Sequence, residues 1–347
     1  MDEKVNFCIY LKKSEPDVSF SSEEHIFPAG IGGIRKLPMQ YVSDDFNNMF
    51  SKMELPFMRH SLLSLPRQFK GPGKRGKLNP KKATEGSISI MSGEDLNSFN
   101  LGYLTLGNPY TIPQIIIDIN GLCHFKSDQS FGDAGKQIAS FVKNLSKYNG
   151  KYILIEDARI SKDEIILGFH RSKWYVALSN EDLKPQIDEY IDKIIQQAPF
   201  NKETPKYGSH QVKVHQTLEF DDSFFRVCGK IIFNYLTLVK GRDFVLNSCF
   251  DPIRDWIVNG GENNFAILTG KETKTSKIVS PKEAHKLFIN QVGKSLVGYI
   301  SFYGDNFETV VKLCDDIDGN FDLEGFLCDW KNREEYSYID YVQKLNN

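Results

Sequence analysis

The spacing of apolar residues along the chain predicts both helices and strands. Short runs rich in β-branched residues and bounded by turn residues are typical of strands, and they occur at 87–92, 114–119, 151–157, 165–170 and 173–178. Apolar residues at three- and four-residue intervals predict helices over 133–148, 183–197, 222–241, 280–293 and 334–345. The pattern therefore predicts an α+β fold.

The sequence of residues 1–60 predicts a compact unit that contains both strands and a helix. A short strand at 6–11 precedes a turn and the segment SSEEHIFPAGIGG at 21–33. Ser21 and Glu24 have the spacing of a helix capping box, but Pro28 and the glycines that follow it would end such a helix within two turns. We therefore expect residues 25–27 to form a short strand that leads into a tight glycine loop.

The next segment, 41–58, predicts an amphipathic helix that ends at Pro56. Its N-terminal cap comes from one of three residues, Ser43, Asp44 or Asp45. One face is apolar, with Phe46, Met49, Phe50 and Met53. A neighbouring polar face carries Asn47, Ser51 and Glu54.

Taken together, EEHIFPAGIGG and YVSDDFNNMFSKME resemble the motifs of HNH endonucleases. In that family E-H-I-I-P and L-G-G precede V-C-x-x-C-N-N and F-S-K-L-E. The resemblance covers residues 6–58 and extends, less specifically, to 67–77, 224–236 and 250–261. It implies an N-terminal ββα-metal unit at 1–66, a basic linker or DNA-contacting loop at 67–82, and a larger mixed α+β domain at 83–347 for recognition or regulation.

The resemblance also implies a chemistry, the hydrolysis of phosphodiester bonds in DNA. Glu24 and Asn47 would hold a single Mg²⁺ or Mn²⁺ ion, because hard cations prefer oxygen ligands. His25 would act as the general base, since an imidazole titrates near neutral pH. Asn48 is the second choice for the amide ligand. On base rates, an isolated histidine in such a loop is more often structural than catalytic.

Some residues of the family pattern are absent. The four zinc cysteines map onto Cys8, Leu11, Ser43 and Phe46, and a single thiol cannot build a tetrahedral zinc site. We expect no structural zinc and an apolar contact of Leu11 and Phe46 in its place. The middle asparagine of the H-N-H signature is missing as well, which affects the orientation of the site. Ser51 replaces a second helical histidine ligand, and His60 is expected to lie at the surface.

A basic segment at 67–82 contains seven cations and no acid. It is interpreted either as a phosphate-binding surface, with Arg67, Lys70, Lys74, Arg75 and Lys77, or as a solvated linker. Glycine and proline argue against a helix there. Arg226 and Lys230 would extend this surface or lie on a solvated helix face.

Composition adds few constraints. The net charge of −2 gives no overall attraction to DNA or to a membrane. Six scattered cysteines and short apolar runs predict a soluble, cytoplasmic protein without a membrane partner. A protein partner or a homo-oligomer would form through the C-terminal domain.

Two functions thus agree with the sequence. The first is a metal-dependent HNH-type endonuclease in which Glu24, His25 and Asn47 form the active site. The second is a degenerate HNH-like module that binds nucleic acid or protein without catalysis, which the missing cysteines and asparagine favour.

Overall fold

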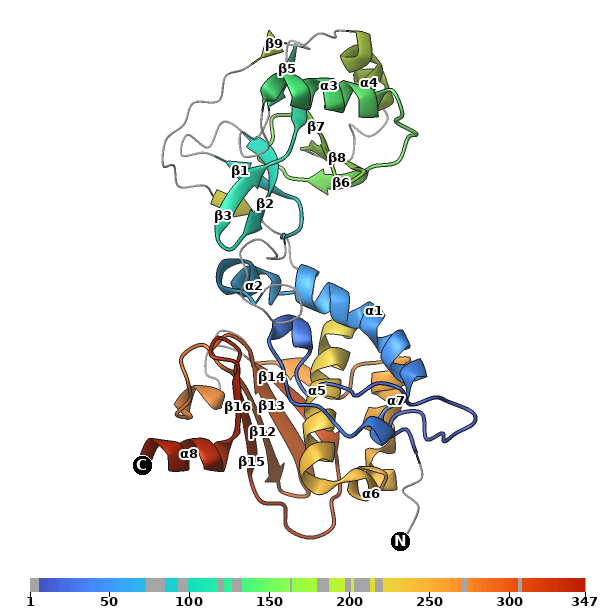
Figure 1. The fold of residues 1–347 in the computed structure, drawn as a ribbon, viewed down its shortest axis with the longest axis vertical. Helices are drawn as coiled ribbons and strands as arrows, with labels where there is room; N and C mark the ends of the chain where they lie inside the picture. The colour runs from blue at the N-terminus through green and yellow to red at the C-terminus, as the bar shows by residue number, and fades with distance from the viewer. Residues whose placement is uncertain are drawn as a thin grey trace. The chain divides into compact units, whose positions relative to one another are not determined.

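The computed structural model describes residues 6–72, 85–92, 99–117, 122–126, 133–162, 164–179, 187–196, 201–202, 213–215, 221–269, 274–304 and 308–346. The α+β class is confirmed, since helices and sheets both occur among these residues (Figure 1). None of the helices in these ranges combines the length and hydrophobicity needed to cross a membrane.

The chain forms two compact units. Unit 1 combines Met1–Thr84 with Leu218–Asn347, and unit 2 is Glu85–Thr217. This division differs from the predicted one, in which 83–347 was a single domain. The final third of the chain instead completes the unit that the N-terminal residues begin, and unit 2 is an insertion into it.

Unit 1 contains an antiparallel sheet with the order β11-β14-β13-β12-β15-β16. Its strands are β11 Ala266–Leu268, β12 His285–Val292, β13 Ser295–Ser301, β14 Glu308–Cys314, β15 Glu324–Asp329 and β16 Glu334–Ser337. The helices of this unit are α1 Asp44–His60, α2 Ser64–Lys70, α5 Asp222–Lys240, α6 Arg242–Val245, α7 Asp251–Asn259 and α8 Tyr338–Asn346. Short 3-10 turns are η1 Ala29–Ile31, η2 Met39–Tyr41, η7 Ser248–Phe250 and η8 Thr275–Lys277.

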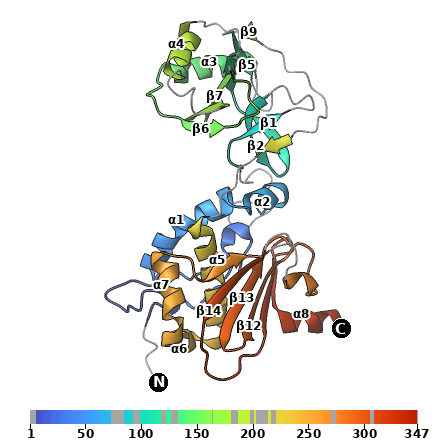
Figure 2. The ribbon, with the colours of Figure 1, turned by 180° about the vertical axis from the view of Figure 1, so that it is seen from behind.

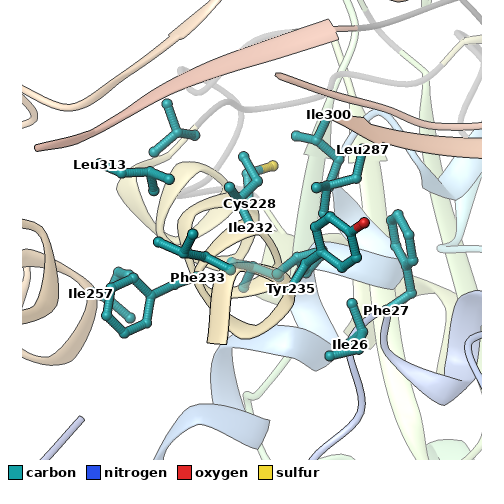
Figure 3. Close-up of a cluster of buried hydrophobic side chains, with 14 of the residues drawn as sticks. Ile26, Phe27, Cys228, Ile232, Phe233, Tyr235, Ile257, Leu287, Ile300 and Leu313 are labelled. Atoms are coloured by element: carbon teal, nitrogen blue, oxygen red, sulfur yellow. The ribbon is translucent and has the colours of Figure 1, made fainter. Parts of the chain in front are cut away.

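Helix α5 is the centre of unit 1. One of its faces lies on the sheet, as Figure 2 shows from the sheet side, and its residues from Val227 to Thr237 are all buried. Gly298 of β13 permits this close packing, because a Cβ there would lie 2.3 Å from a methyl group of Ile232. Figure 3 shows side chains of α5 between strand residues and the N-terminal Ile26 and Phe27.

The N-terminal segment packs against α5. The Phe57 ring of α1 lies 5.3 Å from the Phe224 ring of α5, measured between centroids. Tyr10 stacks on Phe46 at 3.9 Å and contacts Phe233 of α5 at 5.6 Å. Two segments about 200 residues apart in sequence therefore share one hydrophobic core.

The described residues of unit 2 form two sheets and two helices. One sheet has the order β10-β1-β2-β3, with β1 Ser89–Ser92, β2 Phe99–Thr105, β3 Asn108–Thr111 and β10 Lys213–His215. The other has the order β6-β8-β7-β4-β5-β9, with β4 Gln114–Ile117, β5 Cys123–Lys126, β6 Ile153–Glu156, β7 Ile165–His170, β8 Lys173–Leu178 and β9 Asn201–Lys202. Helices α3 Ala134–Leu145 and α4 Ile187–Gln196 share a core with the second sheet.

Several predicted elements differ from the observed ones. The helix predicted at 280–293 is wrong, because this segment contains β12. The segment predicted as a helix at 334–345 begins with strand β16, and only its last two thirds are helical, as α8. Helix α1 does not end at Pro56 but continues to His60. The strand predicted at 6–11 is reduced to a single bridge between Phe7 and Ser14.

Candidate functional site

The segment that carries Glu24 and His25 is a narrow hairpin. The amide of Ile26 donates to the Arg35 carbonyl at 2.9 Å, and the amide of Leu37 donates to the Glu24 carbonyl at 2.8 Å. His25 faces Lys36 in an isolated antiparallel bridge, so the expected short strand is a single pairing. The capping box at Ser21 starts no helix, as expected.

The glycines close this hairpin. A Cβ at Gly33 would lie 1.9 Å from the Phe27 carbonyl oxygen, so only glycine fits there. Gly32 has a φ of 102°, a backbone conformation that disfavours other residues. Beyond the turn, the Glu335 carboxylate of β16 accepts hydrogen bonds from the amides of Ile34 and Arg35. The C-terminal strand thus holds the second arm of the hairpin in place.

A hydrogen-bonded loop joins the first arm to helix α1. The Asp44 carboxylate accepts from the Ser19 hydroxyl at 2.7 Å, the Ser21 amide at 2.8 Å and the Ser22 hydroxyl at 2.8 Å. Burial opposes ionisation of this group, but these serine hydrogen bonds lower the pKa of Asp44 to about 2. The helix itself is capped by Ser43, whose hydroxyl accepts from the Phe46 amide. Asp44 therefore anchors the loop while Ser43 caps the helix.

The corner that corresponds to the zinc cysteines is held by hydrogen bonds and packing. The Cys8 sulfur accepts from the Leu11 amide at 3.5 Å and from the Ser43 hydroxyl at 3.3 Å. Phe46 is fully buried against Tyr10, and Leu11 packs at the edge of the same core. Leu11 and Phe46 thus belong to the same hydrophobic core, and Tyr10 is the ring that stacks on Phe46.

Glu24 lies in a buried ion cluster. The Lys230 ammonium of α5 donates to a carboxylate oxygen of Glu24 and to one of Glu54 in α1. The three side chains are 2%, 13% and 19% exposed for Lys230, Glu24 and Glu54. One ammonium thus sits between two carboxylates that come from the hairpin and from α1, and it joins three segments of unit 1.

The protonation states in this cluster depend on burial and on the shared charges. Burial lowers the pKa of Lys230, but Glu24 and Glu54 more than compensate and leave it above its ordinary value. Burial raises the pKa of Glu24, and Lys230 opposes this effect. The ammonium therefore stays charged, and ionised Glu24 depends on it.

Helix α5 also holds the backbone of His25. Asn234, one helical turn after Lys230, donates to the His25 carbonyl at 3.0 Å. Its side-chain oxygen accepts from the Tyr10 hydroxyl at 2.6 Å. Lys230 and Asn234 were not identified as site residues from the sequence, apart from the possible surface role of Lys230. The usable signal was a lysine and an asparagine inside the apolar run 224–236, since a buried polar group in a helix requires a partner.

The His25 imidazole is partly buried and favours the neutral state. Burial, followed by the positive charges of Lys36 and Lys230, lowers its pKa below the ordinary value. A neutral imidazole can accept a proton, so the expected role as a base is compatible with this environment.

Asn47 lies near the serine loop. Its amide nitrogen donates to the Ser22 hydroxyl at 3.2 Å, and its side-chain oxygen is buried without a hydrogen-bond partner among the residues that the structure describes. Asn48 is exposed, as expected. Ser51 is also exposed, and its hydroxyl donates to the Asn48 carbonyl.

The predicted magnesium site fits these residues only in part. The unpaired Asn47 oxygen would suit a hard cation. Glu24 does not fit, because its carboxylate already carries a buried ammonium, and a hydrated dication beside Lys230 would meet its positive charge. The carboxylate that the resemblance implies as a metal ligand is thus a structural ion-pair partner.

The basic segment begins in a helix. Contrary to the prediction, its first four residues end α2. Arg67 is 8% exposed and donates to the Gly30 carbonyl at 2.9 Å, so it is a structural residue. Lys70 pairs with Glu283 at 2.8 Å. The predicted contacts of Lys74, Arg75 and Lys77 lie outside the described residues.

Arg226 and Lys230 of α5 form no exposed surface. Arg226 donates to the carbonyls of Ile257 and Val258 at the end of α7, and Lys230 is buried in the ion cluster. Both interpretations given for them, a nucleic-acid surface and a solvated face, are therefore wrong. His60 ends α1 in an exposed position, as expected.

Comparison of the chain with protein-family models, with curated proteins and with solved structures finds no match.

Proposed function

We propose that unit 1 is a degenerate HNH-like module that binds nucleic acid without metal-dependent hydrolysis. The observation that carries this proposal is the Lys230 ammonium on Glu24. In the HNH pattern the residue before the histidine is a metal ligand. In this chain the corresponding residue is Glu24, and its carboxylate pairs with the Lys230 ammonium.

The charge balance supports this interpretation. A magnesium ion usually retains several waters and needs solvent space around its protein ligands. Glu24 is 13% exposed and Lys230 only 2% exposed, which leaves little room for a hydrated ion. Moving Glu24 from Lys230 to a metal ion would take from the buried ammonium one of its two carboxylate partners, at a large cost in free energy. The ion cluster is therefore a stable alternative to a metal site.

The basic segment supports nucleic acid as the partner. Arg67 and Lys70 are engaged within unit 1. The sequence continues with five more cations and no acid before Glu85; these cations are Lys74, Arg75, Lys77, Lys81 and Lys82. A dense group of cations releases counterions when it binds phosphates, so binding would weaken as salt increases.

Fluorescence anisotropy with labelled double- and single-stranded DNA tests this proposal. We expect salt-dependent binding in EDTA, with no cleavage product when Mg²⁺ or Mn²⁺ is added. Changing Lys74, Arg75 and Lys77 together to glutamine should weaken binding and reduce the salt slope by about one unit for each lost phosphate contact. A matched control changes three exposed lysines of unit 2, Lys143, Lys147 and Lys151, to glutamine. Equal affinity of the two triple variants would contradict the proposal.

Hydrolysis with His25 as the base is a second candidate. It is favoured by the neutral His25 imidazole and by the unpaired Asn47 oxygen. The same incubations separate the two functions. Cleavage by the wild type that falls by about 10²–10⁴ in His25→Ala would support the second candidate, because a general base contributes that much to a rate.

A further inference from the structure

One outer strand of the sheet in unit 1 is apolar and exposed. β11 stands at the end of the strand order, so among the described residues only β14 pairs with it. Its Ile267 and Leu268 side chains are 65% and 36% exposed. The segment 263–269, NNFAILT, contains no charged residue and no proline. An edge of this kind is a template for pairing with another chain.

The outer strand at the other end of the sheet, β16, is protected in two ways. It carries Glu334 and Glu335, and charged residues discourage pairing between sheet edges. The Glu335 carboxylate also accepts from the amides of Ile34 and Arg35, so an arm of the N-terminal hairpin is bound to this strand. β11 has no charged residue, and its edge needs a different protection.

The backbone of β11 faces β14 and the open edge in turn. The Phe265 carbonyl accepts from a β14 amide at 2.8 Å, and the Thr269 amide donates to a β14 carbonyl at 2.9 Å. In an antiparallel pair, residues that bond to the partner strand alternate with residues whose amide and carbonyl point away from it. Ala266 and Leu268 therefore direct their amides and carbonyls to the open edge.

The Asn263 side chain occupies part of this edge. Its oxygen accepts from the Ala266 amide at 2.9 Å, and its nitrogen donates to the Ala266 carbonyl at 2.9 Å. One side-chain amide thus makes both hydrogen bonds that a residue of a neighbouring strand would make. The same oxygen accepts from the Phe265 amide at 3.2 Å, which fixes the turn before β11. A second strand cannot pair with Ala266 while this side chain is in place.

We propose that Asn263 closes a self-association edge, and that without its side chain β11 pairs with β11 of a second copy of this chain. Two identical antiparallel strands offer each other the same groups, and a two-fold axis closes the contact as a dimer. With the axis at Ile267, the Ala266 backbone of one copy meets the Leu268 backbone of the other. The two exposed isoleucines then become direct neighbours across the new pair.

Sedimentation equilibrium of the full chain at several concentrations tests the proposal. The wild type should have the mass of one chain. Asn263→Ala should rise with concentration toward the mass of two chains, because the Ala266 amide and carbonyl are then open to a partner strand. Asn264→Ala, at the exposed neighbouring position, is the matched control and should keep the mass of one chain.

A double variant separates edge pairing from the role of Asn263 in the local turn. Asn263→Ala combined with Ile267→Lys should return to the mass of one chain, because two ammonium groups would meet at the two-fold axis. Repair of the turn would not follow from that second change. A wild-type dimer, an Asn263→Ala protein with the mass of one chain, or a dimer that persists in the double variant would overturn the proposal.

Circular dichroism shows whether Asn263→Ala keeps the fold. If it does not, Asn263→Ser takes its place in both experiments, with the same expected masses and the same contradicting results. The serine hydroxyl retains an acceptor for the turn, but the amide donor to the Ala266 carbonyl is lost.

Discussion

Replacing Lys230 with methionine is expected to lower the free energy of unfolding by about 3–5 kcal/mol, the range observed when one partner of a buried ion pair is removed. The change leaves the carboxylates of Glu24 and Glu54 close together without their shared ammonium. Methionine retains most of the volume of the lysine stem, so the loss reflects charge more than packing. Urea unfolding followed by circular dichroism measures the effect.

Lys240→Met is a matched control for this change. Lys240 lies on the same helix and pairs with Glu324, but the two side chains are 27% and 25% exposed. Pairs that retain contact with water contribute less than about 1 kcal/mol. In a second control, Lys230→Met is combined with Glu24→Gln and Glu54→Gln, which should recover much of the lost stability. A Lys230→Met variant as stable as Lys240→Met would show that the pairing of Lys230 with Glu24 and Glu54 does not stabilise unit 1.

Acidification is expected to destabilise unit 1 through His285. This residue of β12 is fully buried, and both of its ring nitrogens have partners. Nδ1 accepts from the Tyr303 amide at 3.1 Å, so Nε2 carries the proton and donates to the Ile31 carbonyl at 2.9 Å. A second proton would have to displace the Tyr303 amide. Burial accordingly lowers the pKa of His285 to about 4.

The sign of the effect follows from the two pKa values. In the unfolded chain a histidine titrates near pH 6.5, so the unfolded state binds the extra proton first as pH falls. The stability contributed by neutral His285 is complete above about pH 6.5 and is lost down to about pH 4, at about 1.4 kcal/mol per pH unit and about 3 kcal/mol in total. Urea unfolding of wild type and His285→Gln at several pH values measures it. As the pH falls from about 6.5 to about 4, the free energy of unfolding of the wild type should fall relative to that of His285→Gln by about 1.4 kcal/mol per pH unit. A difference that stays constant over this pH range would contradict the prediction.

The sequence predicted best those elements whose signals are local. Strands 165–170 and 173–178 match β7 and β8 in their bounds, and the helix predicted at 222–241 ends one residue earlier, at Lys240. Asp221 caps that helix and Gly241 ends it, so both limits are encoded beside the helix itself. Such signals need no information about distant residues.

The prediction failed where tertiary packing decides the structure. Residues 285–289 of β12 are all buried, including the polar His285 and Lys286, so the strand shows no alternation of apolar and polar positions. Its apolar run, 287–289, is short, and a short apolar run is ambiguous between helix and strand. Pro56 was expected to end α1, but Phe57 in the following turn is buried against Phe224, and this packing favours continuation of the helix.

The candidate site could be located from the sequence but its electrostatics could not. The Glu-His pair, the glycine loop and Asn47 were recognised as a pattern, and Asn48 was correctly expected to face solvent. The partner of Glu24 lies 206 residues further along the chain. The sequence left Lys230 on an exposed helix face. Only the fold shows that its ammonium pairs with Glu24, the carboxylate that the resemblance implies as a metal ligand.

Titration of the protein with Mn²⁺, in which the electron paramagnetic resonance signal reports the free ion, tests most directly whether Lys230, and not a divalent cation, neutralises Glu24. We expect free Mn²⁺ to rise in step with added Mn²⁺, and equally so for wild type and Glu24→Gln. Binding of one Mn²⁺ per wild-type chain that is lost in Glu24→Gln would contradict this expectation.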